Sequence, residues 1–388
     1  LFIAATAVAS VSPNFQVLLI CRLLQGIGTG IGLPLMMNIV LEQAPYEKMG
    51  TMMGIAMFIT AIAPAVGPSL GGYIVTNFGW RMIFTSLLPL LIVAAFIGAF
   101  SIRQASPVHK FRFTWVDWIL LACAFTCLVI DMSYMSSWGI VDPRFLSLLA
   151  GLAVFLVLFV RHTRSEATPL VNLQTFKCKP FFFSMLAIVL LQSAVLGLGF
   201  LIPNCAQIVW GQTALVAGCL LLPGCIVGGA MAPLSGRIMD KLGAMRPILT
   251  GSGLLAIATV IFAIFFQGMD NNICMACYTL FAFGQSTCVG NMLTNGIRQL
   301  PEDQSADGNA IINTFQQLAG AIGTAIASTI VGSYQSSLGL VAGTSAGTQT
   351  AFVVFAVIGI CVFLSAAASF RSKRVREQSQ TSEMARES

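Results

Sequence analysis

The stretch GNAIINTFQQLAGAIGTAIASTIVGSYQSSLGLVAGTSAGTQTAFVVFAVIGICVFLSAAASF, residues 308–370, holds 63 consecutive residues without Asp, Glu, Lys or Arg. One helical pass through a bilayer takes about 20 residues. The stretch is therefore long enough for two passes. Residues 180–236 form a second uncharged run of 57 residues, and residues 49–80 form a third of 32. Soluble domains do not bury runs of this length, so we place the chain in a membrane with its charges in the turns.

The composition supports this placement. Charged residues make up 9% of the 388-residue chain, against about 25% in soluble domains. Hydrophobic residues reach 57%, and the mean hydropathy is +0.87. The net charge of +6 is spread over short turns and not gathered on one face, which argues against a nucleic-acid partner. Because Leu1 already lies inside an apolar segment, we interpret the chain as truncated at its N-terminus.

Breaks rich in charge or in Pro, Gly and Asn divide the chain into apolar segments. The segments are too long for the strands of a membrane barrel and lack their alternation of polar and apolar residues. The predicted fold class is therefore an all-α membrane protein. We expect twelve spans, the first incomplete: 1–12, 17–41, 49–76, 80–102, 115–138, 143–161, 181–209, 213–236, 247–268, 271–297, 308–333 and 347–370.

Basic residues in the turns predict the orientation. Alternating the turns between two sides puts 17 Lys and Arg on one side and only Arg81 and Arg144 on the other. Basic residues near span ends stay in the cytoplasm, so we expect the tail inside and residues 12–16 outside. The Trp residues fall at predicted span ends, where an interfacial aromatic belt is expected: Trp80, Trp115, Trp118, Trp138 and Trp210.

The second segment contains a motif, RLLQGIGTG, at residues 22–30, with Arg22, Gln25, Gly26, Gly28 and Gly30. An Arg inside a span costs ~2.5–3.5 kcal/mol on insertion scales, which predicts a polar partner for it. The alternative is that its side chain reaches to the outer headgroups. Glycines four residues apart allow a neighbouring helix to approach closely.

The third segment contains APAVGPSLGG at residues 63–72. Gly67 and Gly71 form a face of small residues beside Gly72, and Pro68 removes a helical hydrogen bond. The combination predicts a hinge or a tight seal, although simple packing glycines look the same.

These motifs together resemble one family. Residues 22–30 resemble the fourth-helix motif of the major facilitator superfamily, and residues 63–72 resemble its fifth-helix antiporter motif, with Ala63 in place of the first Gly. Residues 79–89 are similar to the opening of helix six, with Leu87 where the family often has Asn. The stretch GRIMDKLGAMR, residues 236–246, matches the second-half copy of the family's loop motif. The resemblance covers residues 22–89 and 236–327 and implies a helical bundle.

The position of the helix-four motif in the second segment implies that two helices and part of a third precede Leu1. The total of fourteen resembles the EmrB/QacA-type drug:proton antiporters, as do Asp117-Trp118 and residues 313–327, where small residues form a stripe. The resemblance implies a partial N-terminal half at 1–102 (helices three to six), two inserted linker helices at 115–161, a six-helix C-terminal half at 181–370 and a polar cytoplasmic tail at 371–388.

The loop at 236–246 has a mechanical interpretation. The motif begins at Gly236. Asp240 can accept N–H bonds at a helix N-terminus, Arg237 or Arg246 can pair with an acid on a neighbouring helix, and Gly243 permits the tight turn between the spans. We therefore expect a cytoplasmic latch that biases the protein toward its inward-closed state. A generic charged hairpin is the alternative.

Asp131 is the only acid well inside a predicted span. Intramembrane carboxylates suggest proton or cation chemistry. The resemblance places Asp131 on an inserted helix outside the central cavity, so we expect a local hydrogen bond to Ser133, Ser136 or Ser137. The eleven Cys include Cys274-x-x-Cys277 without His or acid nearby, which predicts buried small hydrophobes and no metal site. No nucleotide-binding loop is present, so we expect no ATP-driven pump.

The resemblance implies a secondary exporter of amphipathic or cationic compounds that works by proton antiport and alternating access. It needs no cofactor besides a transmembrane proton gradient. Its expected partners are a lipophilic or cationic small molecule, membrane lipids and an adaptor protein that the sequence does not identify, in a bacterial inner or plasma membrane. Alternatives are an uptake permease for a small metabolite, a membrane thiol redox enzyme and a non-transporting scaffold. The cavity candidates are Gln192, Asn204, Asn291 and Asn295.

Overall fold

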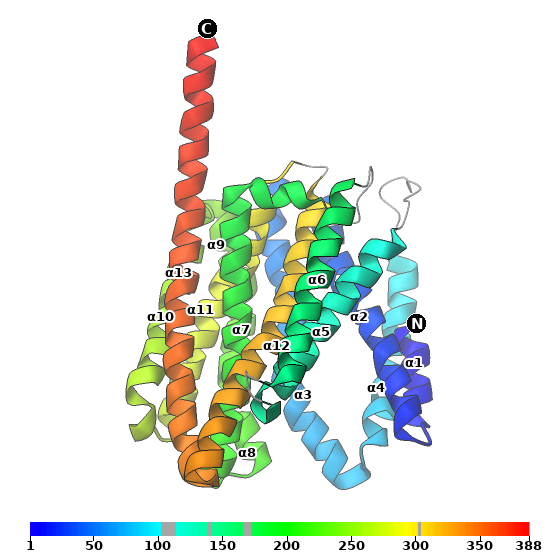
Figure 1. The fold of residues 1–388 in the computed structure, drawn as a ribbon. Helices are drawn as coiled ribbons and strands as arrows, with labels where there is room; N and C mark the ends of the chain where they lie inside the picture. Colours follow the sequence, from blue (N-terminus) through cyan, green and yellow to red (C-terminus); the bar gives the residue numbers. More distant parts are fainter. Residues whose placement is uncertain (102–113, 139–141, 166–171, 302–303, 388) are drawn as a thin grey trace.

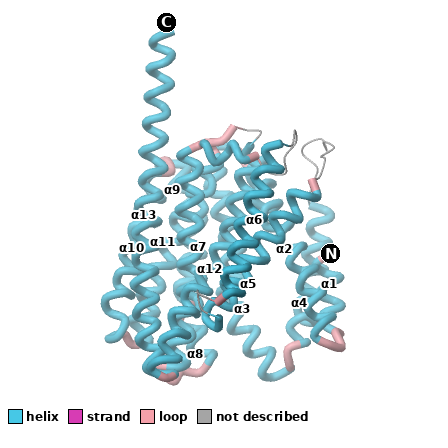
Figure 2. Tube along the Cα trace, viewed as in Figure 1, coloured by secondary structure: helices cyan, strands magenta, loops and turns pink. Residues whose placement is uncertain are grey.

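The computed structural model describes residues 1–101, 114–138, 142–165, 172–301 and 304–387, and their regular structure is entirely helical (Figures 1 and 2). Nine segments of these residues are long and apolar enough to cross a membrane. The helices are α1 (Phe2–Ser10), α2 (Phe15–Gln43), α3 (Met49–Phe78), α4 (Arg81–Ser101), α5 (Trp115–Trp138), α6 (Pro143–Ser165), α7 (Lys179–Ile208), α8 (Ala214–Cys219), α9 (Leu222–Leu242), α10 (Met245–Phe265), α11 (Asn271–Ile297), α12 (Ser305–Leu338) and α13 (Leu340–Glu387), with 3-10 turns η1 (Tyr46–Lys48), η2 (Leu173–Lys177) and η3 (Phe266–Gly268).

Each predicted span corresponds to one helix or, at 213–236, to two successive helices. The span expected at 213–236 is two helices, because Thr213 caps α8 by accepting the Val216 N–H and a new helix, α9, starts at Leu222 with Pro223 in its first turn. The tail at 371–388 continues α13 as a helix as far as Glu387. No Gly or Pro lies between residues 360 and 387 to end it. Figure 1 shows this extension projecting beyond the bundle.

The turns alternate between the two ends of the bundle. The end from which the α13 extension projects also carries the α2–α3, α9–α10 and α11–α12 turns (Figure 1). We name it the basic side, because the predicted basic turns gather there. The α1–α2, α3–α4 and α12–α13 turns lie at the opposite side. This alternation agrees with the order of spans expected from the charges.

Helices α7–α13, here the C-terminal group, hold most of the buried residues. The largest fully buried side chains include Phe181, Phe262, Phe281 and Phe355. Because lipid is as apolar as these side chains, close packing holds such helices together. A Cβ added at Gly323 of α12 would lie 2.0 Å from the Ser193 carbonyl oxygen of α7, so the two backbones touch. The small stripe expected along α12 is thus a packing surface.

Helices α1–α4 are here called the N-terminal group. Three of them, α1, α2 and α4, form a smaller apolar cluster around Ala9, Cys21 and Phe84. At the opposite side, Arg81 donates from Nη2 to the Ser12 carbonyl oxygen at 2.9 Å and ties α4 to the α1–α2 turn. The hairpin of α5 and α6 packs against α12. Contacts between the two groups run through α3 with α8, α9 and α11, and through α2 with α12. The candidate site lies along this seam.

Candidate functional site

Asp240 joins the two groups at the basic side. It lies near the C-terminal end of α9, and its Oδ1 accepts the Gly50 N–H at 2.9 Å. Its Oδ2 accepts the Thr51 N–H at 2.9 Å and the Thr51 hydroxyl at 2.8 Å. The first N–H groups of a helix have no acceptor within the helix, and Lys48 at the N-cap of α3 supplies none. Asp240 therefore caps α3 from the other group, and the helix dipole favours its negative charge.

The backbones of α3 and α9 touch beside this cap. A Cβ added at Gly236 would lie 2.1 Å from the Gly50 carbonyl oxygen, and one at Gly54 would lie 2.4 Å from the Ala232 carbonyl oxygen. Neither gap admits a methyl group, because each neighbour is backbone. We did not anticipate Gly50 or Gly54 from the sequence, although their four-residue spacing is a signal for close helix approach.

The rest of the 236–246 loop is arranged in part as expected. Gly243 ends α9 with φ +83, and its N–H donates to the Met239 carbonyl oxygen at 2.9 Å. Arg237 and Arg246 are exposed, and within the described residues neither forms an ion pair. The expected pairing of Arg237 or Arg246 with an acid is therefore wrong for this conformation. Asp240 is thus the charged residue of the loop that binds the N-terminal group in the described structure.

A second polar contact crosses the seam near the cap. Asn309 of α12 is fully buried and donates from Nδ2 to Asn38 Oδ1 at 2.6 Å and to the Pro34 carbonyl oxygen at 3.2 Å, both on α2. Asn313, one turn further along α12, donates to Asn309 Oδ1 at 2.8 Å. Asn313 of the same helix thus orients the amide of Asn309, and this amide donates hydrogen bonds to α2 of the N-terminal group. Nothing in the sequence pattern pointed to Asn38 or Asn309.

The antiporter-like motif lies on the other half of α3. An added Cβ at Gly67 or at Gly71 would meet no atom within 4 Å. The tight seal expected at these glycines is therefore absent in this conformation. The side-chain surroundings of Pro68 and Gly72 lie outside what the structure describes. The places where the backbone of α3 touches that of α9 lie in the basic-side half of α3, at Gly50 and Gly54.

Arg22 lies in a polar cluster within the N-terminal group. Its Nη1 donates to Gln25 Oε1 at 3.4 Å, and its guanidinium lies 4.8 Å from the centre of the Phe84 ring. Gln25 is buried and donates from Nε2 to Thr6 Oγ1 at 2.8 Å. The expected polar partner of Arg22 is thus Gln25, although the Arg side chain remains exposed. The cluster ties α1, α2 and α4 together.

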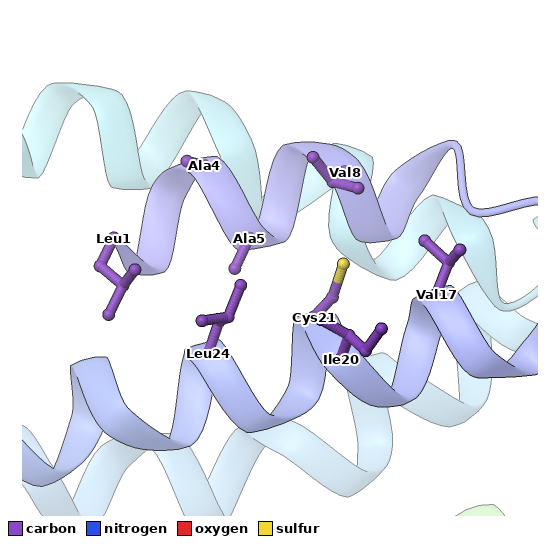
Figure 3. A pocket seen from close by; sticks show the side chains of 8 residues that line it. All are labelled: Leu1, Ala4, Ala5, Val8, Val17, Ile20, Cys21 and Leu24. Atoms are coloured by element: carbon purple, nitrogen blue, oxygen red, sulfur yellow. The ribbon is translucent and has the colours of Figure 1, made fainter.

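Only one of the three motif glycines in α2 packs closely. An added Cβ at Gly28 would lie 3.1 Å from Phe2 Cβ of α1, whereas nothing lies within 4 Å at Gly26 or Gly30. The expected close approach is therefore found at Gly28 and absent at the other two. A shallow apolar groove of about 220 Å³ lies between the same two helices (Figure 3), lined by Leu1, Ala4, Ala5, Val8, Val17, Ile20, Cys21 and Leu24. It lacks the polar groups that orient a ligand.

Two of the cavity candidates keep that role as a prediction. Gln316 donates from Nε2 to Gln192 Oε1 at 3.2 Å and joins α12 to α7 near the middle of both helices. Neither Gln is fully buried. Asn204, further along α7, has a buried Oδ1 without a hydrogen-bond partner. An unsatisfied acceptor of this kind is a position at which a substrate donor can bind.

Asn291 has a different role from the one expected. It is buried, and its Nδ2 donates to Ser235 Oγ at 2.7 Å and to the Thr287 carbonyl oxygen at 2.8 Å. Ser235 belongs to α9, so the Asn291 amide joins α11 to α9. Its N–H groups are already used in hydrogen bonds within the protein. Asn295, one turn further on, is also buried.

The prediction that Asp131 forms a local hydrogen bond with a serine is wrong. Asp131 is fully buried, and both carboxylate oxygens lack a hydrogen-bond partner. Ser133 donates instead to the Val129 carbonyl oxygen at 2.7 Å. The side chains of Ser136 and Ser137 lie outside the described residues.

All eleven cysteines are free thiols. The described part of the chain contains no cluster of three or more His, Cys, Asp or Glu side chains that could hold a metal ion. Cys274 is fully buried within the core of the C-terminal group, as expected for a small hydrophobe.

Known proteins were compared with this chain. A model of the family described as Major Facilitator Superfamily matches residues 1–324. The chain belongs to the major facilitator superfamily. It is thus a multi-pass membrane transporter and not an enzyme, and the predicted all-α membrane fold is confirmed.

Relatives named for drug resistance cover nearly the whole chain. The chain is 33% identical over 374 residues to the lincomycin resistance protein LmrB of Listeria monocytogenes, with 93% of this chain and 79% of the relative covered. It is 32% identical to LmrB of Bacillus subtilis over 388 residues, covering 96% and 80%. A multidrug resistance protein B homolog of Mycobacterium tuberculosis is 25% identical, covering 85% and 62%.

A solved structure shares the fold. The POT family transporter PepTSo superposes with a TM-score of 0.56 at 14% identity, over 96% of this chain and 82% of that one. At this identity the likeness shows the arrangement of helices alone.

Proposed function

We propose that this protein exports amphipathic, often cationic, drug-like molecules across a bacterial cell membrane by proton antiport. The names of its relatives, lincomycin and multidrug resistance proteins, support the substrate class. The basic-residue asymmetry supports a cytoplasmic basic side and tail. The observation that carries the mechanism is the Asp240 carboxylate on the N-terminus of α3.

The seam acts as the cytoplasmic gate in this proposal. With Asp240 bound to α3 and Asn309 bound to α2, the two groups meet at the basic side, which corresponds to the inward-closed state. To open, the groups exchange these hydrogen bonds for bonds to water. Such an exchange has a small net cost for each bond, so the gate is reversible. The backbones of α3 and α9 touch at Gly236 and Gly54, so a small separation of the two helices ends this contact.

The substrate would bind between the groups near mid-depth. Gln192 and Gln316 supply polar groups there, and apolar side chains of α7 and α12 supply the remaining wall. When the cytoplasmic gate opens, the opposite side has to close. Among the described residues, no atom lies within 4 Å of a Cβ added at Gly67 or Gly71, so these glycines can form the reciprocal seal.

Reconstitution tests the direction and the coupling ion. The protein is placed in vesicles, inside-out molecules are quantified by protease accessibility, and movement of a fluorescent lipophilic cation is followed under an imposed pH gradient. An antiporter moves the cation against the proton flow and stops when the gradient is collapsed. Movement with the proton flow would support the uptake permease and refute export.

Cysteine labelling tests the sidedness independently. In a background without accessible native thiols, a cysteine at Arg164 of the basic side is expected to resist an impermeant reagent in intact cells. A cysteine at Arg144, near the start of α6, is expected to react. The reverse pattern would invert the proposed topology.

A further inference from the structure

Asp131 lies deep in a span of the α5–α6 hairpin. It follows Trp115 by 16 residues and precedes Trp138 by seven, and these two Trp bound α5. At the helical rise, Asp131 is about 10 Å from the nearer end of α5. Its side chain is fully buried, and neither carboxylate oxygen has a hydrogen-bond partner. Burying a carboxyl group without a hydrogen-bond partner costs free energy in its neutral form, and the cost is far larger when the group is ionised.

Within the described residues, no cation forms an ion pair with Asp131 from the helices that pack on it. Helix α5 packs against α6 and α12. The titratable residues of α6 lie at its two ends: Arg144 at one end, and Arg161, His162 and Arg164 at the other. Helix α12 has no basic residue, and its acid, Asp307, lies in the first turn at the basic side. On α5 itself, Cys127 lies one turn from Asp131 and is within 3.4 Å of a Cβ added at Gly151 of α6.

The second acid of α5 provides the contrast. Asp117 lies on the same face, 14 residues earlier, and is also fully buried. Its Oδ1 lies 2.8 Å from His162 Nδ1 and accepts the Thr163 hydroxyl at 3.3 Å. A negative charge at Asp117 therefore has a partner on α6, near the end of the helix. Asp131 has the same burial without the partner.

We propose that Asp131 is a proton-binding site, in which the carboxyl group is held as the neutral acid between α5, α6 and α12. The neutral form leaves only polar atoms unsatisfied, whereas the ionised form would leave an unpaired charge inside the span. The proton can leave only when α5 separates from its neighbours and admits water. On the proposed function, movement of α12 would control this step, because α12 also carries the Asn309 contact of the seam.

Infrared spectroscopy tests the protonation directly. The reconstituted wild-type protein is titrated from mildly acid to alkaline pH, and the carbonyl stretch of a protonated carboxyl is recorded with and without aspartate labelled by carbon-13 at the side-chain carboxyl. We expect a band that persists at neutral pH and moves with the label. Asp131→Asn is expected to abolish this band, and the control Asp117→Asn is expected to keep it.

Thermal unfolding supplies a second readout. Because the folded state would hold a proton that the unfolded chain releases at neutral pH, wild-type stability should fall as the pH rises. In the Asp131→Asn and Asp131→Leu proteins, the fall in stability that is due to Asp131 should be absent. A wild-type protein without the neutral-pH band, or with a band that survives Asp131→Asn, would overturn the proposal. Neither measurement uses transport, so failure of the proposed function would leave both results interpretable.

Discussion

Replacing Asp240 by Ala should open the basic side of the protein. The substitution removes the acceptor of two backbone N–H groups, of Gly50 and Thr51, and of the Thr51 hydroxyl. A hydrogen bond to a charged group contributes about 1.5–3 kcal/mol, and we use the low end because Asp240 is only partly buried. The two backbone bonds then sum to about 3 kcal/mol, which changes the closed-to-open ratio by a factor of about 150.

Distance measurements between spin labels provide the assay. Glu42 at the end of α2 and Lys241 at the end of α9 are exposed and belong to different groups. In a background without accessible native thiols, labels at these positions should show one short distance in the wild type. Asp240→Ala should add a longer distance that dominates the distribution. Asp240→Asn, which keeps one acceptor oxygen, should fall between the two.

Asp270 offers a matched control. It caps α11 at the opposite side by accepting the Ile273 N–H at 2.8 Å, entirely within the C-terminal group. Asp270→Ala should lower stability by about 0.5–2 kcal/mol without changing the distance between the groups. If Asp240→Ala folds and keeps the wild-type distance distribution, the cap does not hold the gate and the reasoning fails.

Four further outcomes are expected. Gly236→Ala should also lengthen the distance between the groups, since its Cβ would lie 2.1 Å from a backbone oxygen of α3, while Gly30→Ala, with nothing within 4 Å, should not. Asn309→Ala loses two hydrogen bonds to α2 and should open the gate about tenfold, at about 1.4 kcal/mol, in the same measurement. Arg22→Ala should reach the membrane in normal amounts but export dye more slowly, because Gln25 loses its cationic partner; normal dye efflux would remove any role for the motif. Gly67→Leu should leave the basic-side distance unchanged and slow export by obstructing the reciprocal seal, and full export activity would show that Gly67 closes nothing.

The helices and their order could be predicted because a bilayer leaves the chain few choices. Every backbone polar group must be satisfied inside the span, so a long uncharged segment becomes a helix and its charged ends become turns. Two helix boundaries differ from the ends of the predicted spans, and both have local causes. Thr213 and Pro223 start helices inside one apolar run, and the polar tail lacks the Gly or Pro that would end α13.

Only part of the candidate site could be predicted from the sequence. The 236–246 motif indicated that Asp240 would accept N–H bonds at a helix N-terminus, but its partners at Gly50 and Thr51 lie about 190 residues away along the chain. Spacing alone could have indicated Gly50 and Gly54, and no local pattern indicated Asn38 and Asn309. For Asp131, the nearest serine was the wrong partner, because Ser133 already satisfies a carbonyl of its own helix.

Hydropathy and spacing are properties of neighbouring residues, so the sequence by itself determined the membrane, the helices, their order and the small faces on which they pack. Which faces meet depends on how all the helices pack together, since each pair of small faces could in principle pack with several others. The tertiary structure alone decided that the basic-side half of α3 touches α9 while Gly67 and Gly71 remain open, and that Asp131 is buried without a partner. These are contacts between segments far apart in the chain, and their energies exist only once the helices are packed.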